Sequence, residues 1–95
     1  MTAQRSQAYR VALKTLRDLQ ASKFTPDQMQ VFVDCADAYL FADDDRSHAV
    51  GDELFILAAD ALDTIGSAGR LMPETVERIK AELSAIKTPP LARAA

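Results

Sequence analysis

One segment of the chain gathers side chains that could bind a metal ion. Asp43, Asp44 and Asp45 come shortly before His48 and Asp52. On a helix that begins early, Asp44, His48 and Asp52 lie on one side at four-residue steps. Catalytic zinc sites take three protein ligands, often several of them histidines, and His48 is the only histidine in the chain. We therefore expect no metal ion and no cofactor here, and we expect aspartates of this segment to cap a helix.

The same aspartate run does not fit an EF-hand calcium loop. If such a loop starts at Asp43, Asp45 and Ser47 stand at acceptable positions. His48, however, occupies the place of the required glycine, and Leu54 the place of the bidentate glutamate. The run therefore predicts no calcium site.

Nucleophilic catalysis has no support in the residue types or their spacing. Cys35, the only cysteine, lies on an apolar helical face, where a buried small side chain is expected rather than a reactive thiolate. One histidine leaves no basis for a Ser-His-Asp arrangement. Gly66 and Gly69 are too few for a phosphate-binding loop, and no Lys-Ser or Lys-Thr pair follows them. We expect that the protein is not an enzyme.

Composition limits the class of protein. A chain of 95 residues with 48% hydrophobic and 26% charged residues is typical of one globular domain. A lone cysteine excludes an internal disulfide and fits a reducing compartment. The N-terminal segment has no apolar signal-peptide core, and the longest strictly apolar run, residues 54–59, is far shorter than the roughly 20 residues of a spanning helix. We expect a cytoplasmic protein with no membrane contact.

Four stretches of the chain have helical periodicity, and none has the alternation of a strand. The first helix is expected over residues 4–22, with apolar residues recurring at three- and four-residue steps on one face. Its opposite flank carries Arg10, Lys14 and Arg17 at the same spacing. The sequence therefore predicts an amphipathic helix with a basic stripe.

The second helix has the clearest start signal. Thr25 supplies an N-cap hydroxyl, Pro26 fits the first helical position, and Gln28 completes a capping box. Phe24 before the cap and Met29 on the first turn fit a hydrophobic staple. These residues predict a helix that begins at Pro26.

Apolar residues cover more than half of the circumference of this second helix. A helix of this kind must contact neighbours on two sides, so it is expected to be the central element. Its narrow polar arc consists of Asp27, Gln30, Asp34 and Asp37, and Phe41 is an apolar residue within that arc. Since three short neighbours leave part of so much apolar surface uncovered, we predict a homodimer.

A third helix is expected after a short connection, with Asp45 or Ser47 as its cap, and runs to about Ile65. One side of this helix is apolar and consists of Val50, Leu54, Phe55, Leu57, Ala58, Ala61, Leu62 and Ile65. Its outer face carries four acidic residues around one large apolar residue, and these are Asp52, Glu53, Asp60, Asp63 and Ile56. The third helix is therefore apolar on the inside and acidic on the outside.

A fourth helix opens at Pro73 and ends before Thr88-Pro89-Pro90. Its apolar residues form a narrow seam of Val76, Ile79, Leu83 and Ile86. Glu74 and Arg78 stand four residues apart, the favourable spacing for an ion pair.

The fold class that these segments predict is all-α, a compact bundle of four helices that dimerisation could complete. Residues 1–88 form the helical domain, and residues 89–95 form a short tail. The tail ends in Ala94 and Ala95, an outline that resembles the small apolar C-terminal tags recognised by bacterial ATP-dependent proteases. An untethered tail of small residues is the simpler interpretation.

Charge is distributed unevenly along the chain. The net charge of −3 divides into +4 over residues 1–23, −9 over residues 24–63 and +2 over residues 64–95. One interpretation is self-complementarity: the first helix lies beside the second and third, and exposed pairs contribute about 0–1 kcal/mol each. The other is an acidic docking surface for a partner.

The docking interpretation gives the leading function. An apolar centre with a charged rim is typical of protein interfaces, and Phe41 and Ile56 are apolar residues among carboxylates. The candidate partner-binding residues are Phe41, Ile56, Asp34, Asp37, Asp52, Asp60 and Asp63. We expect a non-enzymatic interaction module, a regulator or accessory subunit, that binds another protein or a second copy of itself.

The alternative is a role connected with nucleic acids. The basic stripe of the first helix could bind DNA or RNA, although the acidic domain as a whole repels phosphate. Conversely, the charge of −9 over residues 24–63 could mimic a phosphate backbone and block a nucleic-acid enzyme.

Overall fold

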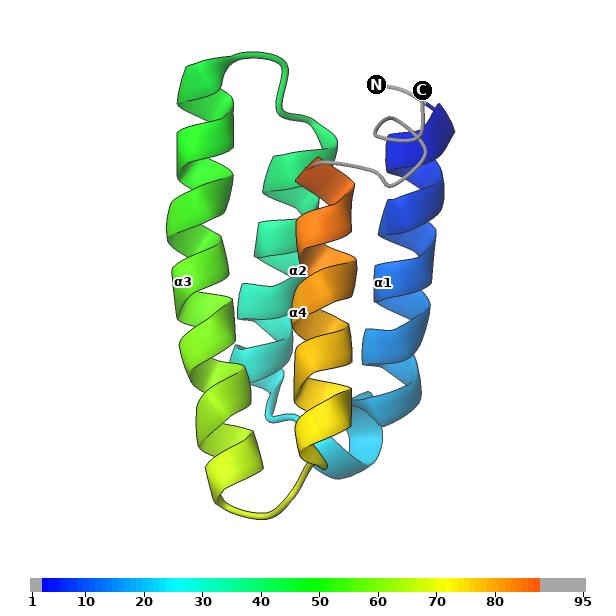
Figure 1. Cartoon of the computed structure of the whole chain (residues 1–95), viewed down its shortest axis with the longest axis vertical. Helices are drawn as coiled ribbons and strands as arrows, with labels where there is room; N and C mark the ends of the chain where they lie inside the picture. The colour runs from blue at the N-terminus through cyan, green and yellow to red at the C-terminus, as the bar shows by residue number, and fades with distance from the viewer. Residues whose placement is uncertain (1–2, 88–95) are drawn as a thin grey trace.

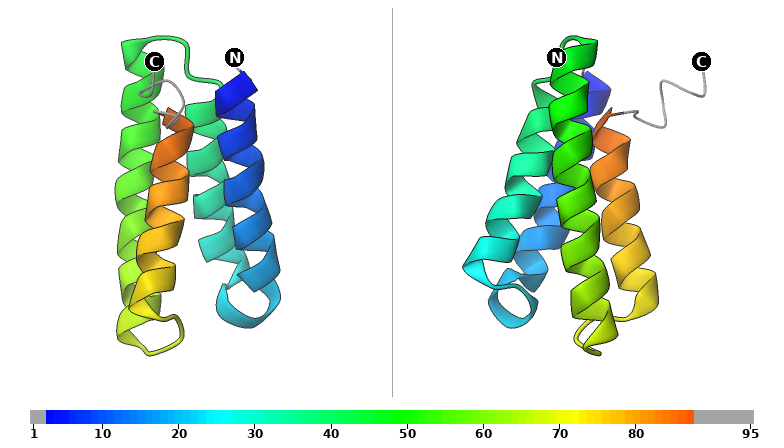
Figure 2. Two further views of the ribbon diagram at one scale, coloured as in Figure 1. Left: turned by 45° about the vertical axis from the view of Figure 1, so that its right-hand side comes forward. Right: turned by 90° about the vertical axis from the view of Figure 1, so that its left-hand side faces the viewer.

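The computed structural model describes residues 3–87, which form an antiparallel bundle of four helices. The helices are α1 (Ala3–Lys23), α2 (Pro26–Leu40), α3 (Asp45–Ser67) and α4 (Pro73–Lys87). Successive helices run in opposite directions, so α1 begins and α4 ends at the same end of the bundle (Figures 1 and 2). The predicted all-α bundle is confirmed, and the expected tail at residues 89–95 lies outside the described residues.

α1 and α3 occupy opposite corners of the bundle, with α4 on one side between them and α2 on the other (Figure 1). Both corner helices pack against α2 and α4. The sequence predicts that the first helix lies beside both the second and the third. It lies beside α2 but not beside α3, because α2 and α4 fill the space between α1 and α3. The outer faces of α1 and α3 consequently point away from each other.

α2 begins as the sequence predicts. The Thr25 hydroxyl oxygen accepts a hydrogen bond from the Gln28 backbone N–H at 3.2 Å, and the Gln28 side-chain oxygen accepts from the Thr25 N–H at 2.9 Å. Phe24 and Met29 are both buried. The Phe24 ring meets Phe32 edge to face, with the ring centroids 4.9 Å apart. The capping box is therefore confirmed, and an aromatic contact fixes the entry of the chain into α2.

The cap of α3 is Asp44, so the predicted cap, Asp45 or Ser47, is wrong. Asp44 is extended, and its carboxylate accepts a hydrogen bond from the Ser47 backbone N–H at 2.7 Å. This bond satisfies one of the N–H groups that the first turn leaves without a partner. Asp45 instead occupies the first turn, where its negative charge stabilises the helix N-terminus.

α3 ends two residues later than expected, at Ser67. Gly69 has a φ of +77°, a conformation that glycine adopts without strain. Its N–H donates to Gly66 O, and the Arg70 N–H donates to Ile65 O. These two bonds form a Schellman motif, which closes the helix and turns the chain towards α4.

Most of the apolar surface of α2 is covered within one chain, and Val31 and Ala38 are half-buried. Its six buried residues are Met29, Phe32, Cys35, Ala36, Tyr39 and Leu40. α2 achieves this burial because it packs against all three other helices. The uncovered surface of α2, from which a homodimer is predicted, is therefore largely absent. A homodimer stays a prediction, and it needs a different surface.

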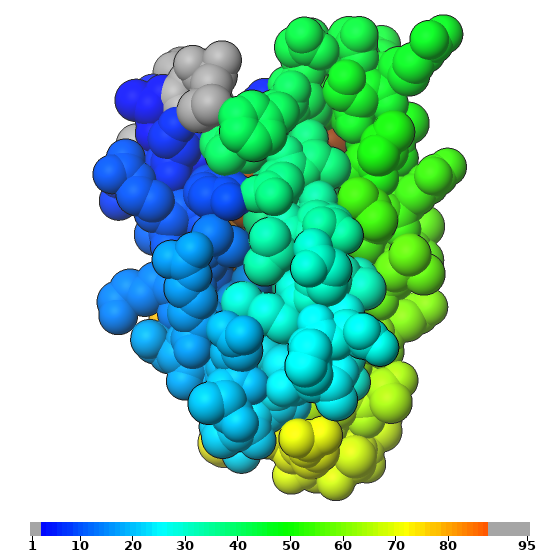
Figure 3. Space-filling view, turned by 180° about the vertical axis from the view of Figure 1, so that it is seen from behind, coloured from blue at the N-terminus to red at the C-terminus, as the bar shows by residue number. Residues whose placement is uncertain are grey.

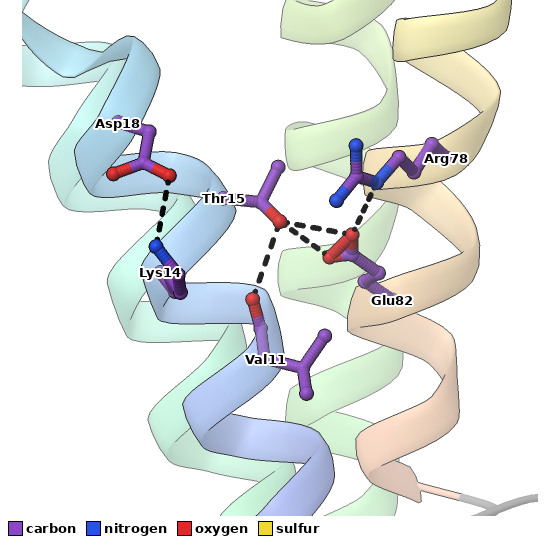
Figure 4. A network of polar contacts seen from close by, with 6 residues as sticks. All are labelled: Val11, Lys14, Thr15, Asp18, Arg78 and Glu82. Carbon is purple, nitrogen blue, oxygen red and sulfur yellow. Dashed lines mark hydrogen bonds and ion pairs between the residues drawn. The ribbon is translucent and has the colours of Figure 1, made fainter.

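α4 buries the predicted seam, since Val76, Ile79, Leu83 and Ile86 are at most 5% exposed. The predicted partner of Arg78 is wrong: its Nε lies 2.9 Å from Glu82 Oε1 instead of pairing with Glu74. Figure 4 shows that Glu82 also accepts a hydrogen bond from the buried Thr15 hydroxyl of α1, whose oxygen lies 2.7 and 2.9 Å from the two carboxylate oxygens. Glu82 therefore joins α1 to α4.

Candidate functional site

Two of the predicted partner-binding aspartates hold helices together. Asp37 accepts a hydrogen bond from the Tyr9 hydroxyl of α1 at 2.6 Å, and burial with this bond raises the pKa of Tyr9 to about 12. Asp63 lies 2.6 Å from Lys80 Nζ of α4, and its hydrogen bond raises the pKa of Lys80. Both carboxylates therefore form contacts with another helix of the same chain.

Asp52, a third member of the predicted set, is engaged in the same way. It accepts the Tyr39 hydroxyl of α2 at 2.6 Å and Lys87 Nζ of α4 at 2.9 Å. The hydrogen bonds from Tyr39 and Lys87 lower the pKa of this carboxyl. The acidic face of α3 is thus partly neutralised by lysines of α4, not by the basic stripe of α1.

Asp34 and Asp60 are the predicted acids whose carboxylates form no hydrogen bond or ion pair with another helix among residues 3–87. Asp34 is exposed on α2 and accepts a hydrogen bond from the neutral Gln30 amide at 2.7 Å. Asp60 is exposed on α3 and raises the pKa of Lys80 through its charge, although Lys80 is held by Asp63. These two carboxylates keep their charge available to an external group.

Phe41 and Ile56 are exposed, at 66% and 61%, but Phe41 is the C-cap of α2 at one end of the bundle, whereas Ile56 lies midway along α3. Phe41 stands one turn after Asp37, which faces α1. Ile56 stands one turn after Asp52, which contacts both α2 and α4. The structure therefore does not bring the two predicted anchors into one patch.

The aspartate and histidine segment before and within α3 serves the fold. Asp44 caps the helix, and its pKa is lowered by the hydrogen bonds from Ser47. Asp52 is held by other helices. His48 is half-buried, and its Nε2 has no hydrogen-bond partner among the described residues. Within residues 3–87, no group of three acidic, histidine or cysteine side chains is arranged to hold a metal ion.

Cys35 is fully buried, as the sequence predicts. Burial raises the pKa of its thiol to about 12, and the nearby charge of Asp52 adds to this effect. A thiol in this state is protonated at neutral pH and is a poor nucleophile.

The basic stripe of α1 is on the surface. Arg10, Lys14 and Arg17 are exposed and line a shallow depression together with Tyr9, Leu13 and Asp18. Lys14 Nζ lies 3.4 Å from Asp18, so one of the three charges is paired within the helix. The stripe faces away from α3.

An apolar strip lies on the outside of α3, where the sequence predicts a buried side. Val50 and Leu57 are 50% and 55% exposed, and Leu54 and Ala61 beside them are half-buried against the core. We call these four residues the α3 strip. They follow one another at steps of four, three and four residues, the spacing of a coiled-coil seam. That spacing is the sequence signal by which the strip could be found.

Exposed acidic residues border the α3 strip on its own helix. Glu53 and Asp60 are seven residues apart, and both are exposed. Since each stands three residues after Val50 or Leu57, the two carboxylates form a row about 60° around the helix from the strip. Glu53 was not among the predicted partner-binding residues.

α2 continues the apolar surface and adds a second acidic border. Cys35 Sγ lies 4.0 Å from Gly51 O of α3, so this side of α2 faces α3. Val31 and Ala38, about one turn before and after Cys35, are half-buried on the same side. Asp34 stands next to them on the exposed side. Figure 3 shows this face of the molecule, with α2 (cyan) in the middle and α3 (green) beside it.

Comparison of the chain with protein-family models, curated proteins and solved structures finds no match. Among the described residues, no helix combines the length and apolar character needed to cross a bilayer.

Proposed function

We propose that the protein is a non-enzymatic interaction module that binds another protein through the outer surface of α2 and α3. In this role it acts as a regulator or an accessory subunit. The observation that supports the proposal is the α3 strip, where two large side chains, Val50 and Leu57, leave half of their surface in water.

The arrangement of this surface resembles that of protein interfaces. Interfaces have an apolar centre that loses its water on binding and a charged rim that orients the partner. Val31 and Ala38 widen the apolar centre, and Glu53 and Asp60 supply part of the rim. Single exposed apolar residues are common, but here two exposed and two half-buried apolar residues stand at seam spacing along one helix.

Affinity capture from the native host tests the proposal. Three tagged forms are compared: the unaltered protein, Leu57→Ser, and Met72→Ser as the matched control, since Met72 is 67% exposed outside the strip. We expect the unaltered protein and the Met72→Ser form to retain the same bound proteins, and the Leu57→Ser form to lose them. If every bound protein is retained by Leu57→Ser, the surface is not the binding site.

Ile56→Ser and Phe41→Ser separate the strip from the anchors that the sequence suggests. If capture depends on Ile56 or Phe41 and not on Leu57, the partner binds a different face of the module. Light scattering in the same series tests self-association. A mass of one protomer at micromolar concentration contradicts a homodimer.

A nucleic-acid role is the second candidate, and the exposed basic stripe of α1 is the observation that favours it. Binding of this kind weakens steeply with salt, because each phosphate contact releases a counterion. We expect Arg10→Glu with Arg17→Glu to abolish such binding and Leu57→Ser to leave it unchanged. Titration of labelled DNA and RNA without detectable binding at low salt contradicts this candidate.

A further inference from the structure

The spacing of the α3 strip favours a helix as its occupant. Residues at steps of four, three and four keep one seam in register with the seam of an adjacent helix, whose side chains fit between them. The strip extends from Val50 to Ala61, which corresponds to about 16 Å of helix. A helix of about three turns therefore covers it.

The charges around the strip determine which charge the flanking residues of that helix should carry. Glu53 and Asp60 border the strip on α3, and Asp27 and Asp34, also seven residues apart, are exposed on α2. Within residues 3–87, none of these four carboxylates forms an ion pair. An interface is stabilised and oriented when opposite charges face each other, so lysine or arginine fits both borders.

A second copy of this chain fits the strip poorly. In an antiparallel pairing of two strips, Glu53 of one copy approaches Asp60 of the other. Like charges at an interface disfavour association. The basic residues of α1 cannot relieve this repulsion, because α1 lies at the opposite corner of the same bundle (Figure 1).

We propose that the α3 strip is the docking site for an amphipathic helix of a partner protein, with an apolar seam of about three turns bordered by lysine or arginine. This inference rests on the proposed function of the α2 and α3 surface. The occupant lies along α3 and adds a fifth helix at the exposed corner of the bundle.

Three synthetic peptides of equal length test the proposal with the full chain. The first has a leucine seam bordered by lysines, the second has the same seam bordered by glutamates, and the third has the composition of the first with its leucines spread around the helix. Fluorescence anisotropy measures binding, and amide chemical shifts locate it. We expect the first peptide alone to bind, with shifts on the α3 strip and at Val31 and Ala38, and with an affinity that falls as salt is added.

Paired variants separate the charge effect from the apolar effect. Glu53→Lys with Asp60→Lys should weaken binding of the lysine-bordered peptide by about tenfold or more and improve binding of the glutamate-bordered one. Glu74→Lys with Glu77→Lys makes the same charge change on the exposed side of α4 and should have a smaller effect. Leu57→Ala and Leu57→Ser should both weaken binding, and circular dichroism with thermal unfolding verifies that each variant is folded.

Four results overturn the proposal. The first two are binding of the glutamate-bordered peptide, or of the peptide without a seam, as tight as that of the lysine-bordered peptide. The third is a set of chemical-shift changes that map to α1. The fourth is a loss of affinity in Glu53→Lys with Asp60→Lys that is no larger than the loss in Glu74→Lys with Glu77→Lys. A dimer in light scattering that Leu57→Ser returns to a monomer also overturns it, because a second copy then covers the strip.

The proposed function and this inference fail in different ways. If capture of native partners depends on Leu57 but is unchanged by Glu53→Lys with Asp60→Lys, the surface binds a partner whose chemistry is not basic, and only the inference is wrong. If capture does not depend on Leu57, the proposed function of the surface is wrong as well.

Discussion

The Tyr39 hydroxyl donates a 2.6 Å hydrogen bond to Asp52, and this contact joins α2 to α3. Lys87 Nζ of α4 lies 2.9 Å from the same oxygen, so one carboxylate links three helices. Tyr39 is 3% exposed, and burial together with the bond to Asp52 raises the pKa of its hydroxyl. Asp52, which the sequence predicts as a partner-binding residue, thus stabilises the bundle itself.

Tyr39→Phe should lower the free energy of unfolding by about 1–2 kcal/mol, because a hydrogen bond to a carboxylate is lost while the ring still packs. Asp52→Asn should lower it similarly. Urea denaturation of both single variants and the double variant measures the coupling. We expect the double variant to lose less than the sum of the two, and full additivity contradicts a direct interaction between these side chains.

The two tyrosines of the chain should both titrate above the ordinary pKa of tyrosine, 10.0, while the protein is folded. Burial, which is the largest cause, favours the neutral phenol over the phenolate, and the bonds to Asp37 and Asp52 add to it. Because the folded-state pKa is the higher one, this contribution to stability is complete below pH 10 and is lost as the pH rises through the folded-state values. Ultraviolet absorbance titration checks this. A phenol that ionises near pH 10 in the folded protein contradicts the prediction.

Gly51→Ala should destabilise the protein even though alanine is the better helix former. A Cβ on Gly51 lies 2.5 Å from Tyr39 Cδ1 and 2.6 Å from Cε1, and the buried ring has little room to move. Overpacking of this kind costs about 1–3 kcal/mol, against a gain of about 1 kcal/mol in helix propensity. Thermal unfolding measures the net loss. In a Tyr39→Leu background the same substitution should cost less, and an equal cost in both backgrounds contradicts the proposed clash.

Local signals made part of this fold predictable. The start of α2 depends on Thr25, Pro26 and Gln28, which act on one another within a single turn. The buried seam of α4 likewise follows from spacing along one helix. The sequence predicts Asp45 or Ser47 as the cap of α3 instead of Asp44, because Asp43, Asp44, Asp45 and Ser47 are all good capping residues and only the path of the chain selects among them.

Contacts between helices were not predictable from these patterns. Asp34 and Asp37 lie on the same polar arc of α2, yet Asp37 meets Tyr9 and Asp34 faces water. The difference depends on which helix is the neighbour. The exposure of Val50 and Leu57 has the same origin: α3 stands at a corner with two neighbours, so its wide apolar arc is only partly covered.

Thr15→Val should lower the free energy of unfolding by about 1 kcal/mol. The two side chains have nearly the same shape, but valine cannot donate to Glu82, whose side chain is only 14% exposed and keeps a single bond to Arg78. Thr64→Val is the matched control, since the Thr64 hydroxyl is exposed and, among the residues that the structure describes, donates to Asp60 O of its own helix. Chemical denaturation compares the two. Equal losses contradict a specific contribution from the contact between α1 and α4.

Cys35 should react with thiol reagents only when the chain unfolds. Its side chain is fully buried, and the pKa raised to about 12 leaves little thiolate at neutral pH. Because the folded-state pKa exceeds the ordinary value of 9.0, ionisation also favours the unfolded chain above that pH. An aromatic disulfide reagent followed by absorbance measures the rate, which should rise with urea in step with unfolding.

An exposed thiol provides the control for this experiment. Ser84 is exposed on α4, so Ser84→Cys in a Cys35→Ala background should react rapidly without denaturant. Rapid, complete labelling of Cys35 in the folded protein contradicts the prediction, because the reagent then reaches Sγ without global opening. If Cys35 is labelled slowly while the cysteine at position 84 is labelled rapidly, the packing of Cys35 against Gly51 excludes the reagent on the timescale of the reaction.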